Sequence, residues 1–107
     1  MITRLCDKRT RERAPGVQMT VMGCTDKMMV VEFAMVRGTA VKPHQHPHEQ
    51  ISYVVQGKVA YYDGQGTRFV LEAGECCAFE SEQPHGAKAL TDAVIVDTFS
   101  PPREDFV

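Results

Sequence analysis

The chain has 107 residues, of which 43% are hydrophobic, and its formal net charge at pH 7 is −2. This length suits one domain with a core of its own, and the hydrophobic content excludes a disordered chain. A net charge this small gives no electrostatic reason to expect nucleic acid or an anionic membrane surface as a partner. No hydrophobic run is long enough to span a bilayer.

The cysteines and the start of the chain bear on the cellular compartment. The cysteines are Cys6, Cys24, Cys76 and Cys77; two are adjacent and none form a CxxC pair. This spacing favours neither a zinc knuckle nor a disulfide framework. Because the start of the chain shows no secretory signal pattern, we expect a cytoplasmic protein with reduced thiols. The adjacent pair would then be small apolar fillers on opposite faces of one strand.

The leading segment, residues 1–13, is polar and locally basic, with the sequence MITRLCDKRTRER. A basic arm of this kind can contact an anionic partner, but a solvated segment is the simpler interpretation. We expect the folded domain to occupy residues 14–107.

From residue 17 onward the chain consists of short hydrophobic, β-branched and aromatic runs separated by glycines and other turn residues. Such evenly spaced runs, with no helical period, predict an all-β sandwich, jelly roll or small barrel. The nine predicted strands are Val17–Met22, Met28–Val36, Val41–His46, Gln50–Gln56, Lys58–Tyr62, Thr67–Leu71, Cys76–Phe79, His85–Leu90 and Ala93–Phe99. Pro101 and Pro102 prevent the last strand from continuing.

Three of the four histidines crowd into one stretch, HQHPHEQ, residues 44–50. Alternate residues of a strand point to the same face, so His44 and His46 project together from the predicted strand Val41–His46. Two imidazoles side by side can bind a divalent metal ion. Gln50 begins the next strand with the same parity, and its amide oxygen can supply another ligand.

The remaining histidine, His85, is far away in the sequence, on a strand that a barrel would bring close to the others. His48 shares the parity of the first two histidines, but the proline before it and the change of strand leave its direction open. It can be a ligand, or it can support a ligand from behind. Glu49 has the opposite parity and is expected to face outward, becoming a ligand only if the strand is bulged.

The order of the whole set is more specific than any single histidine. It runs Gly38, five residues, His44, one residue, His46, three residues, Gln50, six residues and Gly57, then sixteen residues to Gly74 and ten more to His85. This layout resembles the two motifs of the cupin superfamily, matched here by GTAVKPHQHPHEQISYVVQG and more loosely by GECCAFESEQPHGAKA. The resemblance implies a single-domain β-barrel of the double-stranded β-helix or jelly-roll type, usually paired into a homodimer through its edge strands.

The second motif departs from the usual cupin pattern. Glu80 and Glu82 stand where cupins usually carry a proline and a glycine, and Ala89 replaces a frequent asparagine. In the first motif, Gln50 replaces the usual glutamate. Because all three histidines remain, these departures bear on the shape of the loop more than on metal binding.

Within the cupins, further stretches narrow the resemblance: HPHEQISYVVQGKV, ALTDAVIVDTFSPPRED and the APGV run from Ala14. They are similar to the KdgF-type proteins of pectin and alginate breakdown. That resemblance implies an enzyme for the metal-dependent ring opening of 4,5-unsaturated uronate monomers to linear 4-deoxy-5-keto uronates. It implies a small sugar acid as the partner and functional roles for Asp97, Phe99 and Arg103.

The chemistry of ring opening explains why these groups are needed. Asp97 can move protons, since apolar surroundings would raise its pKa into a useful range. Arg103 can bind the uronate carboxylate through its planar donors, and Phe99 can form an apolar wall for the sugar ring. Without the resemblance, simpler interpretations stay open: Asp97 as a turn residue at a strand end, and Arg103 as a surface arginine paired with Glu104 or Asp105.

The expected ligands His44, His46, Gln50 and His85 are all neutral, so a bound divalent ion keeps its full charge. Imidazole suits zinc, nickel and iron, and the amide oxygen also tolerates manganese. The three tyrosines lie on the middle strands and are interpreted as packing residues. Tyr61 and Tyr62 must face opposite ways.

Two other functions fit the same motifs. In a cupin dioxygenase, the histidines would hold Fe(II) that activates O₂. In a sugar-binding or sensory cupin, the fold and the metal site would be present without any chemistry, because a fold alone does not make an enzyme.

Overall fold

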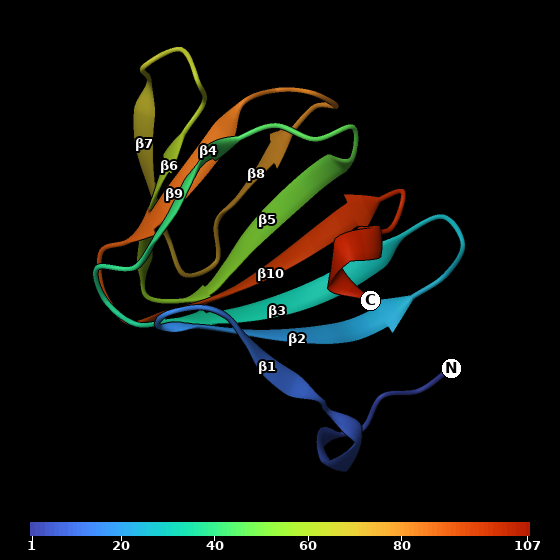
Figure 1. Cartoon of the computed structure of the whole chain (residues 1–107). Coiled ribbons are helices and arrows are strands. Elements are labelled where there is room, and N and C mark those ends of the chain that lie inside the picture. The colour runs from blue at the N-terminus through green and yellow to red at the C-terminus, as the bar shows by residue number, and fades with distance from the viewer.

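The computed structural model describes residues 1–107 and contains ten strands and two short 3₁₀ helices (Figure 1). In chain order they are η1 (Leu5–Asp7), β1 (Thr10–Ala14), β2 (Val17–Cys24), β3 (Met29–Met35), β4 (Ala40–His44), β5 (Glu49–Gln56), β6 (Lys58–Tyr62), β7 (Arg68–Glu72), β8 (Cys76–Phe79), β9 (His85–Ala89), β10 (Ala93–Ser100) and η2 (Glu104–Phe106). None of the helices is long and apolar enough to cross a membrane.

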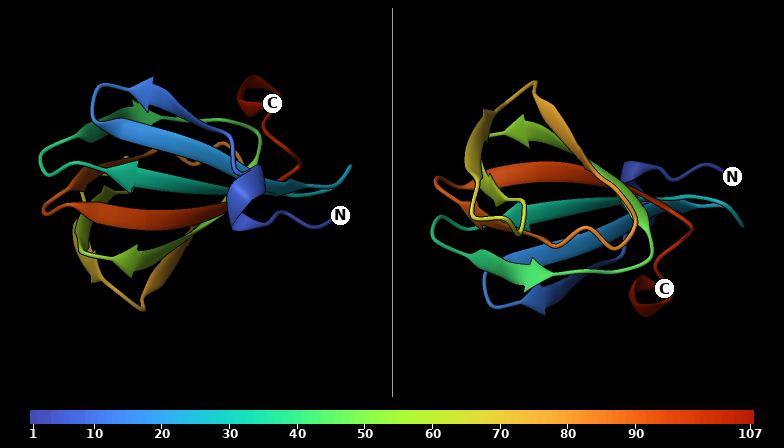
Figure 2. Two further views of the ribbon diagram at one scale, coloured as in Figure 1. Left: turned by 90° about the horizontal axis from the view of Figure 1, so that it is seen from below. Right: turned by 90° about the horizontal axis from the view of Figure 1, so that it is seen from above.

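The strands form two antiparallel sheets that face each other, as both views of Figure 2 show. The six-stranded sheet has the order β1-β2-β3-β10-β5-β8, and the four-stranded sheet has the order β4-β9-β6-β7. The predicted all-β jelly roll is therefore confirmed. β10 lies between β3 and β5, so its residues are at the centre of the larger sheet.

Period-two alternation decides which side chains enter the space between the sheets. Along β10 every second residue is buried, from Ala93 to Phe99, and β3 and β5 show the same alternation. The buried side chains make one hydrophobic cluster drawn from both sheets. Polar residues with the inward parity, such as Gln50 and Asp97, are thereby carried into the same interior.

All nine predicted strands are present, with ends within two residues of the predicted ones. The sequence analysis did not predict β1. Its five residues, TRERA, are all exposed, so they lack the alternation that marks a strand. Backbone pairing with β2 forms this edge strand, and the hydroxyls of Thr10 and Thr20 add a hydrogen bond of 2.7 Å.

The predicted strand Val41–His46 is wrong at its end, because β4 stops at His44 and His46 lies in the loop that follows. Pro43 has no N–H to donate to the neighbouring strand. The register with β9 is irregular between Val41 and His44. Alternation along one strand therefore does not explain how the two histidines come together.

The end of the chain returns to cover the interior. As predicted, the last strand stops before the two prolines, but the short helix η2 after them was not predicted. Its Phe106 is buried, with its ring centroid 5.6 Å from that of Phe99 and 6.0 Å from that of Phe33. Figure 1 shows η2 beside the large sheet, near the ends of its strands.

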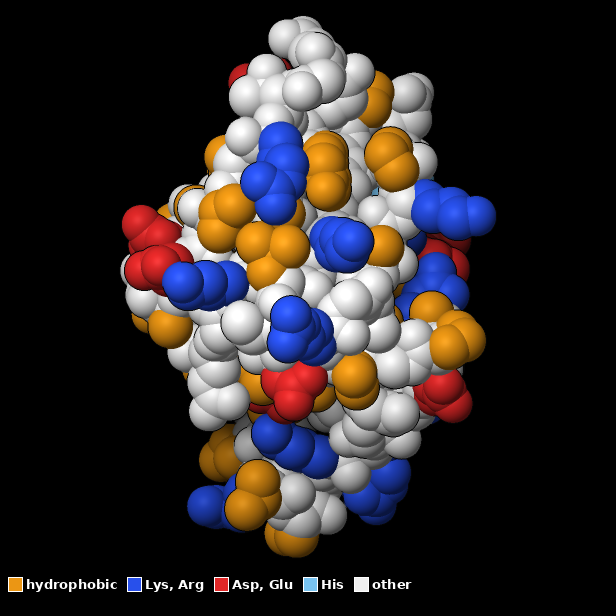
Figure 3. Space-filling model, turned by 90° about the vertical axis from the view of Figure 1, so that its left-hand side faces the viewer, with side chains coloured by type: hydrophobic (Ala, Val, Ile, Leu, Met, Phe, Trp, Pro, Cys, Tyr) orange, Lys and Arg blue, Asp and Glu red, His pale blue; other side chains and the backbone are white.

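The outer face of the four-stranded sheet is mixed in character. Figure 3 shows, on this side of the molecule, lysine and arginine side chains spread among hydrophobic ones, with acidic side chains at both edges and between them. Lys58 of β6 and Glu72 of β7 lie opposite each other and form an exposed ion pair at 3.4 Å. The charges of both signs are thus interspersed here.

Gly57, in the turn between β5 and β6, offers a test of the fold. Its φ is +83°, and an added Cβ would collide with the carbonyl oxygen of Asp92 and lie 2.6 Å from the hydroxyl of Thr91. We expect Gly57→Ala to lower the free energy of unfolding by about 2–5 kcal/mol, from left-handed strain plus overpacking. Chemical denaturation measures this.

Gly66→Ala is the matched control for that substitution. Gly66 has a similar φ of +85°, but an added Cβ would meet nothing within 4 Å. It should cost only the backbone strain, about 1–2 kcal/mol. Equal losses at the two positions would show that the collision at Gly57 is relieved by movement of the neighbouring turn.

Candidate metal centre

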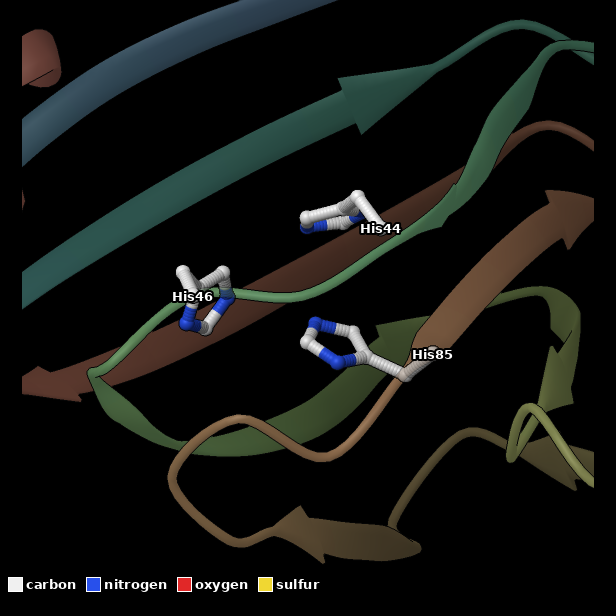
Figure 4. A group of neighbouring side chains, drawn as sticks. All are labelled: His44, His46 and His85. Atoms are coloured by element: carbon white, nitrogen blue, oxygen red, sulfur yellow. The ribbon is translucent and has the colours of Figure 1, made fainter.

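Two histidines that are neighbours in the sequence and a third from a distant strand converge in the interior. His44 ends β4, His46 lies in the loop after it, and His85 begins β9 (Figure 4). One ring nitrogen from each lies within 4.8 Å of those of the other two. His46 and His85 are buried and His44 is half-buried. The structure therefore brings together the three histidines that the sequence analysis singled out.

Backbone carbonyls orient all three rings. Nδ1 of His44 lies 3.0 Å from the carbonyl oxygen of Lys42. Nδ1 of His46 lies 3.0 Å from the carbonyl oxygen of His48, and Nδ1 of His85 lies 2.8 Å from that of Gln83. A carbonyl can only accept, so each Nδ1 carries a hydrogen and each Nε2 is the atom left to face the centre. This is the arrangement that metal-binding histidines usually have.

Gln50 completes the group. Its Oε1 lies 3.2 Å from Nε2 of His46 and 3.1 Å from Nε2 of His85. Burial, the largest cause in both cases, lowers the pKa of His46 and lowers the pKa of His85 to about 4. Both rings are therefore neutral at pH 7, so these contacts bring acceptor lone pairs together. A cation between them would turn this repulsion into attraction, so the residues fit a divalent metal ion.

The amide of Gln50 is oriented by Asp97, because its Nε2 donates to Oδ2 of that carboxylate at 3.0 Å. Asp97 is buried in the middle of β10, so its interpretation as a turn residue is wrong. Its other oxygen, Oδ1, is buried without a hydrogen-bond partner. Burial raises the pKa of Asp97 to about 7, against the opposing effects of Ser52, Arg103 and Gln50.

A cavity of about 450 Å³ opens onto this group. Its lining includes His44, Gln50, His85, Asp97, Phe99 and Arg103. The volume is typical of sites for small molecules. All but one of the expected site residues thus share one cavity. The exception is His46, whose ring packs edge-on against Phe99, with the ring centroids 6.0 Å apart.

Comparison with known proteins identifies the family to which the chain belongs. Residues 31–99 match the cupin domain family. The chain is a member of the cupin family. It is 31% identical over 98 residues to the pectin degradation protein KdgF of Dickeya dadantii, a match that covers 90% of this chain and 88% of that protein.

Solved structures of other cupins have the same fold as this chain. KdgF from a Halomonas species superposes with a TM-score of 0.94 at 32% identity, covering 100% of this chain and 98% of the other. An RmlC-like cupin from Shewanella frigidimarina gives a TM-score of 0.94 at 31% identity, covering 99% of this chain and 95% of the other. This cupin is therefore similar to KdgF in sequence and in fold.

Arg103 of this cupin lines the cavity, with its side chain only 11% exposed. Its Nε and Nη2 donate to the two oxygens of Asp105 at 3.0 and 2.9 Å. Its guanidinium also lies over the rings of Phe99 and Phe106, at 5.2 and 4.3 Å. The arginine thus lines the site and, as the simpler interpretation had it, is paired with Asp105.

Two residues with open roles lie outside the group of metal-binding atoms. His48 is half-buried; its carbonyl orients His46, and the two rings lie 5.3 Å apart, edge to face. Glu49 is exposed, as its parity predicted. His48 therefore supports a candidate ligand from behind.

The loop that departs from the usual cupin motif contains a residue in the left-handed conformation. Glu82, where a glycine is usual, has a φ of +63°, a conformation that glycine adopts without strain. Its backbone N–H donates to the carbonyl of His46 at 2.8 Å, and its side chain accepts from Gln45 at 3.3 Å. The glutamate thus holds the loop that carries His46.

The sequence analysis missed several residues at this site. Ser52 has the same parity as Gln50 on β5, and that signal could have identified it as an inward polar residue. Tyr61 packs in the core as predicted, and it also lines the cavity, with its hydroxyl 2.5 Å from that of Ser52. Arg13 and Phe106 also line the cavity, and no sequence pattern marks them.

Proposed function

We propose that this cupin opens the ring of 4,5-unsaturated uronate monomers and so yields linear 4-deoxy-5-keto uronates during pectin or alginate breakdown. The observation that carries the proposal is the buried Oδ1 of Asp97, free of partners, beside a candidate metal centre. Arg103 lines the same cavity. The likeness to KdgF of Dickeya dadantii supports this choice of substrate class.

The cavity suits a sugar acid of one ring. Its volume of about 450 Å³ is in the range for small ligands. The buried ring of Phe99 offers an apolar wall, and the guanidinium of Arg103 offers planar donors to a carboxylate. Phe106, which is buried beside Phe99, adds a second apolar ring to the lining.

Ring opening moves one proton from oxygen to carbon. Asp97 accepts the proton of the anomeric hydroxyl, the bond between C1 and the ring oxygen breaks as C1 becomes an aldehyde, and the ring oxygen is left as an enolate at C5. The same carboxyl group then donates the proton to C4, which leaves a ketone at C5. His44, His46, Gln50 and His85 would hold one divalent ion, whose charge stabilises the oxyanions formed on the way.

The test follows the ultraviolet absorbance of the conjugated double bond, which disappears on ring opening. We expect the metal-loaded protein to accelerate its loss above the spontaneous rate, and we expect chelation to abolish that acceleration. No acceleration with zinc, nickel, manganese or iron would overturn the proposal. Oxygen uptake coupled to turnover would instead indicate a dioxygenase, and binding without turnover a sugar-binding or sensory cupin.

Asp105 occupies the donors that Arg103 would offer to a substrate carboxylate. We expect Asp105→Asn to lower KM for the uronate about two- to fivefold, because an ion pair with one half-exposed partner is worth about 1 kcal/mol. Glu104→Gln, which removes a charge from a neighbouring exposed residue, is the control. A higher KM in Asp105→Asn would mean that the aspartate orients Arg103 for the substrate.

The assembly and location complete the proposal. We propose a homodimer, supported by Ile51, Tyr53 and Val55, which expose apolar surface in a row on the outer face of β5. Light scattering should then give twice the chain mass of 11.9 kDa. The four free cysteines support a reducing compartment, the cytoplasm.

A further inference from the structure

Arg13 is brought to the cavity by an irregularity in the edge strand β1. In the register with β2, pairing runs up to Glu12 and resumes at Ala14, so Arg13 is left without a partner. An extra residue of this kind bends an edge strand and re-aims its side chain. The side chain of Arg13 is 49% exposed and still lines the cavity, so it lies where the cavity meets solvent.

The lining of the cavity has an excess of basic side chains. Arg13, Lys42 and Arg103 line it, and Asp97 is its one acidic residue. A concave surface with charges mainly of one sign concentrates ligands of the opposite sign. The lining therefore favours an anionic ligand over a neutral sugar.

Arg13 and Arg103 already share one carboxylate. Oδ2 of Asp105 lies 2.9 Å from Nη2 of Arg103 and 3.7 Å from Nη2 of Arg13. Both guanidinium groups also lie over the ring of Phe106, at 5.2 Å for Arg13 and 4.3 Å for Arg103. Two positive groups this close repel each other unless an anion lies beside both. The two arginines are thus arranged around a carboxylate.

Docking of η2 against β1 would by itself explain the contacts of Arg13, because Asp105 and Phe106 both belong to η2. Another arginine of β1 docks η2 without lining the cavity: Arg11 donates from Nη2 to the carbonyl oxygen of Phe106 at 2.6 Å. Arg13 differs from it by lining the cavity, which Asp105 does not. A carboxylate inside the cavity can therefore compete with Asp105 for Arg13 and Arg103.

We infer that Arg13 is a second substrate-binding arginine, and that the carboxylate of a sugar acid replaces the Asp105 carboxylate between Arg13 and Arg103. This inference rests on the proposed function and names the residue that makes its site specific for acids. A neutral sugar would leave both arginines with Asp105 and gain nothing from them. Because Arg13 contacts η2 and not the candidate metal centre, its loss should show in substrate binding and not in metal affinity.

The experiment measures kcat and KM for the unsaturated uronate and, separately, the binding of galacturonate and of neutral galactose by NMR titration. Galacturonate carries the carboxylate but lacks the double bond, so its binding is independent of turnover. We expect Arg13→Gln to raise KM and to weaken galacturonate binding about tenfold, the loss typical of one hydrogen bond to a charged group. Its kcat and Co²⁺ affinity should stay within about twofold of the wild type. Arg13→Lys, which keeps the charge, should recover most of the loss.

Arg11→Gln is the matched control, since it removes an arginine that docks η2 from outside the cavity. It should leave KM and galacturonate affinity within about twofold of the wild type. Equal losses in Arg11→Gln and Arg13→Gln would mean that Arg13 acts by docking η2, and would overturn the inference. Equal binding of galacturonate and galactose by the wild type would overturn it too.

Failure of the inference and failure of the proposed function give different results. A wild type that binds galacturonate through Arg13 but opens no uronate ring would contradict the proposed function and support the second arginine. Ring opening with an unchanged KM in Arg13→Gln would overturn the inference and leave the proposed function standing.

Discussion

Replacing Asp97 with asparagine is expected to lower kcat for ring opening about a hundredfold to ten-thousandfold, the range for loss of a positioned proton-transfer group. Asparagine has nearly the same shape and keeps a carbonyl oxygen that can accept from Gln50 Nε2, as Oδ2 does now. Metal affinity should therefore fall far less than kcat. Single-turnover and steady-state loss of the double-bond absorbance, beside a Co²⁺ titration, measure the two quantities.

Asp26→Asn is the matched control, since it removes the same charge from an exposed residue in the turn after β2. It should behave as the wild type in both measurements. A kcat within about threefold of the wild type in Asp97→Asn would show that Asp97 does not carry the proton, since proton-transfer groups contribute far more than that. Its buried Oδ1 would then need another explanation.

Replacing His85 is expected to reduce metal affinity more than about a hundredfold, beyond the range for residues that only support a ligand. His85 is buried, faces Gln50 Oε1 at 3.1 Å and stacks on Phe79 with ring centroids 4.5 Å apart. Because His85→Ala also leaves a hole against Phe79, His85→Asn is the second variant. The metal-dependent part of the rate should be lost in both.

His48→Ala is the control for that prediction. It removes an imidazole beside the centre but keeps the backbone carbonyl that orients His46. Its metal affinity should stay within about tenfold of the wild type. A loss of this size is no larger than the smallest losses typical of residues that only orient a metal ligand. If His48→Ala loses as much affinity as the His85 variants, then His48 is a ligand and the assignment of the group must change.

Local patterns were sufficient for much of the fold. Period-two alternation and turn residues located nine strands, because a strand with one buried face repeats its hydrophobic residues every second position. Parity also placed Gln50 inward and Glu49 outward on β5. The strand β1 was not predicted, because all its residues are exposed and no alternation marks it.

The sequence by itself determined which groups could form the centre: the spacing of its histidines, the parity of Gln50 and an aspartate inside an apolar run. Only the tertiary structure decided where these side chains lie relative to one another. It ended β4 at His44 and placed His46 in a loop, where the backbone N–H of Glu82 donates to its carbonyl oxygen. It also set Ser52 against Asp97 and Tyr61, since register and sheet packing join residues that no local pattern relates.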